Sequence, residues 1–421
     1  MLWSETKSID LGGHARHRPK PNPVKPGFVG PDIPSQLHFR PSALAASIAR
    51  TATLSGAPLP VLAALRDSAL TKLQHLIAPG PTFQLSSNFQ FLADTERTHL
   101  AACVGAGITD LLMNTLGYTW RDNAAALSAS LDPHADFIYG GGNASRYGVV
   151  LAEAHGSFSS QVSQALISRR AKNKYNWQVK PYIATTSLYG DVIHGYSVAF
   201  GSKPSTSYTF LHVSETHIKK YSAAGSVPPR HSEIASKETN ARLVLAAHRS
   251  NFALMGAYPV VAAIDMIRQG AGEAGITDAV FVRFADGPRS YLVCTAVPWH
   301  HHRRRRFWPR YAPDDLPWWN ESPDHDRSIP FWGLFAMEET ACAEFLNQLS
   351  RMVARRDPHI PEQLELPALV SLGFGKDAEE SDGNRSEYLA AQFRDGLALL
   401  ERLPPERGVR VWRPGDGLGE A

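Results

Sequence analysis

The sequence is poor in cysteine and has no long apolar run, and each shortage excludes a class of protein. Three cysteines occur among 421 residues, Cys103, Cys294 and Cys342, and none of them has CxxC spacing. This argues against a disulfide framework and a zinc ribbon, and it favours a reducing cytoplasm. No stretch reaches the roughly 20 apolar residues that span a bilayer, and the first residues lack the apolar core of a signal peptide. We therefore expect a cytoplasmic protein without a membrane partner.

A strong excess of charge is also absent. Lys and Arg number 43 and Asp and Glu 40, which leaves a formal net charge of +3. This mildly basic balance permits nucleic acid binding without requiring it. Since 43% of the residues are hydrophobic, a chain of this length can bury a large core and form two or three lobes.

What the sequence does contain is a pair of carboxylates set in two apolar runs. Asp136 opens the strand-like stretch 136–139, and Glu153 interrupts the apolar run 149–155. A buried carboxylate is costly unless a cation or several donors satisfy it. Because side chains alternate along a strand, Glu153 and His155 share one face.

The glycine-rich segment 140–148 between these runs predicts the turn of an antiparallel hairpin. Such a hairpin would bring Asp136 back beside Glu153. Two carboxylates on neighbouring strands make a hard-oxygen site that suits Mg²⁺ or Mn²⁺ and accepts phosphate oxygens.

This pattern resembles the PD-(D/E)XK superfamily of metal-dependent nucleases, whose motif is an Asp at the start of one strand and (Asp/Glu)-x-Lys on the next. The resemblance implies a mixed α/β fold: a restriction-endonuclease-like core sheet flanked by helices, in the order helix, strands, helix, strand. It implies a metal held by Asp136 and Glu153, with DNA as the nucleic acid partner. Periodicity predicts the two helices at 89–116 and 159–175 and a following strand at 179–188.

The resemblance also implies an additional acid from the helix before the hairpin, and Glu96 would fill that role. It lies one turn from Leu92 and from Leu100 in the apolar stripe of the helix at 89–116. We therefore expect Glu96 to point inward and to join the metal site.

The chain departs from the family motif at its third position, where His155 replaces Lys. A neutral imidazole can act as a general base, but it lacks the permanent charge of Lys. Lys172 and Lys174, at the end of the next helix, could reach back as a migrated lysine. The alternative is a non-catalytic protein that keeps the nuclease fold for binding or assembly. A third hypothesis is a hydrolase that acts on something other than nucleic acid.

Each of these residues also has a structural interpretation. Asp136 could cap a turn, Glu153 could belong to a buried ion pair, Glu96 could lie at the edge of its stripe, and His155 could be a hydrogen-bonded structural histidine. As a set in this order they favour a metal-dependent nuclease that hydrolyses phosphodiester bonds of DNA, with all four residues at its catalytic site. Bacterial defence or restriction is the usual setting of the superfamily.

Two basic clusters are predicted to contact nucleic acid. One follows Glu153 closely, and the other stands beside Phe307 and Trp308 in a segment that also holds three consecutive histidines. Cations bind phosphates and rings stack on unpaired bases, although a solvated surface is the alternative for both clusters. The consecutive histidines lack the spacing of zinc ligands. The clusters are Arg169, Arg170, Lys172 and Lys174, and Arg303, Arg304, Arg305 and Arg306.

The chain is expected to divide into four segments. Residues 1–40 form a disordered, basic, proline-rich arm, and residues 41–85 a helical segment. Residues 86–300 form the nuclease-like core, which a hairpin at 279–297 could extend. Residues 301–421 hold the basic and aromatic loop, helices at 345–352 and 388–403, and a poorly ordered tail after 404. A protein partner and homo-oligomerisation both stay open.

Overall fold

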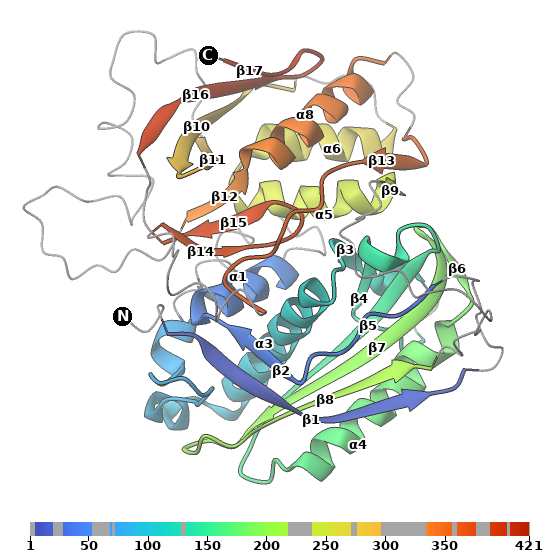
Figure 1. Cartoon of the computed structure of the whole chain (residues 1–421), viewed down its shortest axis with the longest axis vertical. Helices are drawn as coiled ribbons and strands as arrows, with labels where there is room; N and C mark the ends of the chain where they lie inside the picture. The colour runs from blue at the N-terminus through green and yellow to red at the C-terminus, as the bar shows by residue number, and fades with distance from the viewer. Residues whose placement is uncertain are drawn as a thin grey trace, which may run out of the picture.

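The computed structural model describes residues 5–19, 28–52, 68–69, 72–127, 132–217, 238–270, 276–295, 334–355, 360–375, 388–401 and 405–420. Its elements form two halves, each built on one large sheet (Figure 1). The N-terminal half contains the described residues up to 217, and the C-terminal half contains those from 238 onward.

The first sheet has the strand order β2-β1-β8-β7-β5-β4-β3, and a short strand, β6, pairs with β7. Strands β3, β4 and β5 form an antiparallel meander, whereas β5 and β7 are parallel. Strand β8 is antiparallel to β7 and parallel to β1. The strands are β1 (Lys7–His17), β2 (Gln36–Phe39), β3 (Trp120–Asn123), β4 (Phe137–Gly140), β5 (Val149–Phe158), β6 (Thr186–Ser187), β7 (Gly190–Ser202) and β8 (Thr209–Thr216).

Helices cover both faces of this sheet. Helix α1 (Pro41–Ala52) packs on α3 (Asp94–Thr115), and α3 lies directly on β5. A Cβ atom on Gly105 would lie 2.5 Å from the Gly156 nitrogen, so only glycine permits this approach. Helix α4 (Gln164–Lys174) crosses the opposite face (Figure 1) between β5 and the parallel β7, as a crossover helix does.

The predicted hairpin around the carboxylate pair is confirmed. Strands β4 and β5 pair antiparallel, with Phe137 opposite Ala152. The predicted strand at 179–188 is wrong. A π-helix, η4 (Tyr175–Val179), and a 3-10 turn, η5 (Lys180–Tyr182), occupy the first part of that stretch, and the two-residue strand β6 lies near its end. The strand parallel to β5 begins at Gly190.

The expectation of a disordered arm over residues 1–40 is wrong for much of its described length. Residues Lys7–His17 form β1, which pairs with β2 through its first residues and with β8 through its last. Glu215 on β8 accepts hydrogen bonds from His14 Nε2 over 2.9 Å and from Arg16 Nε over 2.8 Å. The basic residues of this strand therefore have partners that lie far away in the sequence.

The second sheet is antiparallel, with the order β14-β15-β12-β11-β10-β16-β17. Helices α6 (Tyr258–Gln269) and α8 (Glu339–Val353) pack against this sheet, and α5 (Ala241–Leu254) packs on α6 and contacts β3 and α1 of the first half (Figure 1). Two short strands, β9 (Glu238–Asn240) and β13 (Gln363–Glu365), pair separately. The strands of the sheet are β10 (Ala279–Asp286), β11 (Arg289–Thr295), β12 (Leu334–Glu338), β14 (Leu389–Gln392), β15 (Leu397–Leu400), β16 (Glu406–Arg413) and β17 (Gly417–Glu420).

Three expectations for the C-terminal half are wrong. The predicted hairpin exists as β10 and β11, but it lies in the second sheet and does not extend the first. The segment predicted as a helix at 388–403 is the hairpin β14–β15, which turns at Asp395 and Gly396, where Gly396 has a φ of +90°. The tail after 404 is β16 and β17, because both strands find partners beside β10.

One continuous apolar core joins the two halves, from Ile9 on β1 to Trp412 on β16. The halves are also joined by a buried ion network in which Arg50 on α1 binds Asp110 on α3 and Asp395 in the second half. Among the described residues, no helix combines the length and the apolar character needed to cross a membrane.

Candidate active site

Asp136 is placed by the first residues of the hairpin. It immediately precedes β4, and its carbonyl oxygen accepts the Ala124 N–H over 3.0 Å. Its side chain reaches across to β5, where Oδ2 accepts the Ala154 N–H over 2.9 Å. The carboxylate thereby accepts a backbone N–H of the neighbouring strand and lies next to Glu153.

Glu153 lies in the middle of β5 on the face that α4 covers. Its side chain is 1% exposed, and Oε1 accepts a hydrogen bond from Lys174 Nζ over 2.8 Å. When both carboxyl groups are ionised, the other oxygen, Oε2, has no donor among the described residues. A buried acceptor without a donor carries a large desolvation cost.

The pKa of Glu153 reflects the burial of its carboxyl group and the charges around it. Burial and, after it, the negative charge of Asp136 raise this pKa to about 8, although Lys174 opposes both effects. A hydrogen bond with Asp136 also favours the protonated form, since two ionised carboxylates have no proton to share. At neutral pH the pair therefore holds a proton unless another cation takes its place.

His155 and Arg170 complete the cluster. His155 follows Glu153 on the same face of β5 and is half-buried. Burial and, after it, the cations of Arg170 and Lys174 lower the pKa of His155 to about 4, although Asp136 opposes them. The imidazole is therefore neutral at physiological pH, and the positive charge at this site comes from α4.

The structure does not place Glu96 with this group. Glu96 lies in the first turn of α3, its side chain is 53% exposed, and it pairs with Lys72 over 3.2 Å. The expectation that it points inward is wrong, because α3 begins at Asp94, and Leu92 precedes the helix and does not define its buried face. The first buried residue of the helix is Leu100.

The first basic cluster divides between the two flanks of α4. Arg170 and Lys174 act on His155 and Glu153, whereas the charge of Lys172 acts on His17 and His212 on β1 and β8. Arg169 is exposed. The second cluster, Arg303 to Arg306, lies outside the described residues.

One contact at the site could not be predicted from the local sequence. Gln178 Nε2 donates to the carbonyl oxygen of His134 over 3.1 Å, which ties η4 to the segment that leads into Asp136. The side chains of Lys174 and Gln178 thus both reach toward the hairpin. The sequence feature that indicates α4 as part of the site is the first basic cluster, which follows Glu153 closely.

Among the described residues, no group of three or more His, Cys, Asp or Glu side chains is arranged to hold a metal ion. The site offers two carboxylates, one of which has a buried oxygen without a donor. Mg²⁺ is commonly held by one or two carboxylates and keeps several waters. The donor set therefore fits a hard divalent cation and does not fit a fully enclosed structural metal.

The chain was compared with protein-family models, with curated proteins and with solved structures, and none of them matches it.

Proposed function

We propose that this chain is a metal-dependent nuclease that hydrolyses phosphodiester bonds of DNA, with Asp136 and Glu153 as its metal ligands. The observation that carries the proposal is the buried Oε2 atom of Glu153, which has no donor among the described residues when this carboxyl and that of Asp136 are both ionised. A proton shared with Asp136 or a bound cation would satisfy this oxygen. A site that binds a divalent cation leaves an oxygen open for it.

The order of the elements supports a restriction-endonuclease-like core. Helix α3 precedes the antiparallel meander β3–β4–β5, and α4 then leads to β7, which is parallel to β5. This is the order helix, strands, helix, strand that the resemblance to the PD-(D/E)XK superfamily implies. Asp136 and Glu153 lie at the motif's two acidic positions.

Mg²⁺ or Mn²⁺ would be held by these two carboxylates, and water would complete its coordination. When bound, such a cation supplies Lewis-acid stabilisation of phosphate oxygens and lowers the pKa of a bound water. The remaining tasks fall to the residues on β5 and α4.

Lys174 supplies the permanent positive charge that His155 lacks. Its ammonium group lies 2.8 Å from Glu153 Oε1, and 38% of its side chain is exposed, so it is open to a substrate from the solvent side. Arg170, one turn earlier on α4, adds a second cation on the same flank. The neutral imidazole of His155 can accept a hydrogen bond from a water beside the carboxylates.

The test is cleavage of labelled single-stranded and duplex DNA by the purified full chain with Mg²⁺, Mn²⁺ or a chelator. Glu153→Gln keeps the shape of the side chain and removes its ability to ionise, and Glu96→Gln is the matched control at an exposed acid outside the cluster. We expect Glu153→Gln to lose activity on the order of 10²-fold or more, and Glu96→Gln to cut as the wild type does.

Equal cleavage by the wild type and Glu153→Gln would contradict the catalytic assignment. If the wild type binds DNA but does not cut it with any metal, the chain is a binding protein with a nuclease fold. The replacement of the motif lysine by His155 is the feature that favours this second function.

A further inference from the structure

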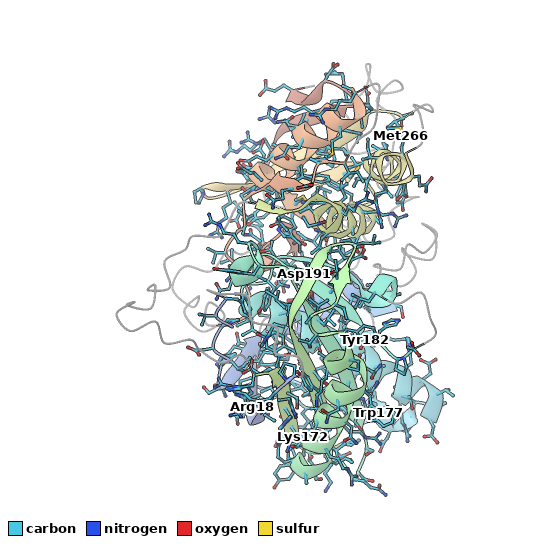
Figure 2. All side chains as sticks on the ribbon, turned by 90° about the vertical axis from the view of Figure 1, so that its right-hand side faces the viewer. Arg18, Lys172, Trp177, Tyr182, Asp191 and Met266 are labelled. Carbon is cyan, nitrogen blue, oxygen red and sulfur yellow. The ribbon has the colours of Figure 1, made fainter. Side chains whose placement is uncertain are left out.

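Trp177 is a large aromatic side chain that the fold holds out into solvent next to the candidate site. It is 72% exposed, although tryptophan is highly buried on average. In Figure 2, Lys172, Trp177 and Tyr182 lie on the side of α4 and the following segment that faces the viewer. An exposed aromatic needs no special role by itself, so its surroundings decide what it can do.

The backbone around Trp177 is anchored on both sides. Tyr175 is fully buried, its hydroxyl lies 2.8 Å from Thr216 Oγ1, and its ring stacks on His17 with centroids 4.5 Å apart. Val179 is fully buried as well. The residues between them form the π-helix η4, a rare conformation that is frequent at functional sites. Trp177 is therefore held outward by a fixed segment.

The same segment reaches into the candidate site. Lys174, which ends α4, binds Glu153, and Gln178, the neighbour of Trp177, binds the carbonyl oxygen of His134 two residues before Asp136. Trp177 thus lies between two side chains that contact the hairpin of the carboxylate pair. Trp177 is therefore anchored close to the candidate site through its neighbours in the chain.

The charge of this surface fits a nucleic acid strand. Residues 154–190 contain five Lys or Arg and no Asp or Glu. Arg170 and Lys180 are exposed on either side of Trp177, and Lys174 is half-exposed. Cations that follow a phosphate backbone beside an aromatic ring are the elements of single-strand binding, in which bases stack on the ring.

We infer that Trp177 stacks on an unpaired base next to the bond that is cut, so that the substrate is single-stranded DNA at this position. The inference rests on the proposed function for the cutting step, but the stacking itself requires no catalysis. Bases inside a duplex have their faces covered by their neighbours and present only their edges in the grooves. A duplex could use the cations of this surface but not the ring.

The experiment measures binding, in the inactive Glu153→Gln background, of fluorescent oligothymidylate and of a duplex of equal length. Trp177→Ala removes the ring, Trp177→Phe keeps an aromatic face, and Tyr208→Ala is the control at another exposed aromatic, 65% exposed. We expect Trp177→Ala to weaken single-strand binding on the order of 10-fold. Trp177→Phe should keep most of the affinity, and duplex binding should not change.

Two outcomes would overturn the inference: no loss of single-strand affinity in Trp177→Ala, or an equal loss for the duplex. Absence of any DNA binding would overturn it too and would make a protein partner the better explanation of the exposed ring. Loss of single-strand binding in Trp177→Ala, together with a wild type that cuts nothing, would support the inference and reject the nuclease. If the wild type cuts DNA and Trp177→Ala cuts single strands equally well, the nuclease is supported and the inference about Trp177 is rejected.

Discussion

Two of the buried clusters of carboxylates and cations among the described residues differ in how completely the carboxylates are satisfied. Between the two halves, Asp110 accepts hydrogen bonds at both oxygens, from Arg50, Ser47 and Tyr139, at distances of 2.9 to 3.2 Å. Asp395 binds Arg50 and Asn251 through Oδ2, and its Oδ1 accepts the Leu397 N–H over 3.3 Å. The four oxygens all have donors.

The candidate site also combines buried carboxyl groups with cations, but there the Glu153 Oε2 atom lacks a donor when both carboxyls are ionised. Burial would raise the pKa of Asp395, but Arg50 and Arg121 lower it below its usual value. Burial raises the pKa of Glu153 to about 8, and the single hydrogen bond from Lys174 does not offset it. We infer that the cluster with saturated carboxylates holds the two halves together, whereas the cluster of Glu153 keeps a carboxyl oxygen available for a proton or a metal.

The largest expected effect is the loss of stability when the saturated network is broken. Asp110→Ala leaves the fully buried Arg50 and Arg121 with one carboxylate between them, and breaking such a pair costs about 3–5 kcal/mol. Urea denaturation measures the loss, and Asp110→Asn serves if the alanine variant does not fold. Glu153→Gln should cost far less, because its carboxyl is already largely neutral at pH 7. Equal losses in the two clusters would remove the distinction between them.

The next effect is on catalysis and concerns Lys174. Lys174→Met keeps the aliphatic stem and removes the charge beside Glu153, so we expect cleavage to fall on the order of 10²-fold. Lys172→Met is the control, because Lys172 acts on His17 and His212 on the other flank of α4.

Rescue separates a chemical role of Lys174 from a structural one. Adding His155→Lys to Lys174→Met returns a lysine to the motif position on β5, and we expect part of the activity to return. A double variant as inactive as Lys174→Met, with unchanged stability, would show that the charge of Lys174 is not what the site lacks.

A smaller effect is the pH dependence of stability. The pKa of Glu153 rises from an ordinary 4.5 to about 8 on folding, so its protonated form favours the folded state. That stability is fully present below about pH 4.5 and is lost as the pH rises through about 8. A divalent cation binds the ionised form, so stabilisation by Mg²⁺ should grow over the same range. Thermal unfolding at pH 6 and pH 9, with and without Mg²⁺, measures both trends, and both should vanish in Glu153→Gln.

Strong local patterns predicted the centre of the fold. The hairpin between Asp136 and Glu153 follows from two apolar runs and a glycine-rich turn, and the structure pairs these strands. Helices α3 and α4 lie within the predicted ranges. The sequence left two candidates, Lys172 and Lys174, for the lysine beside Glu153. The rotation of the helix about its own axis decides between them, and that rotation is fixed only when the buried side chains of the helix pack on the sheet.

The errors came from contacts between residues far apart in the sequence. Strand β1 has a basic sequence with glycines, and it becomes a strand because β8, about 200 residues later, supplies its parallel neighbour. The segment 388–403 has helical periodicity, but its Asp395-Gly396 pair is a strong signal for a hairpin turn. Whether the turn signal or the helical periodicity determines the structure depends on whether a neighbouring sheet can pair with the strands.

The smallest expected effect concerns Glu96, which the motif resemblance places at the metal and the structure places on the surface. Its ion pair with Lys72 joins side chains that are 53% and 38% exposed, and exposed pairs of this kind contribute roughly 0–1 kcal/mol. We expect Glu96→Gln to change neither the free energy of unfolding beyond that range nor the apparent affinity for Mn²⁺ measured by calorimetric titration. A marked loss of metal affinity, with Glu153→Gln as the positive reference, would mean that Glu96 reaches the carboxylate pair when the cation binds. The first turn of α3 would then have to move toward the site, because Glu96 pairs with Lys72 and lies outside the carboxylate cluster.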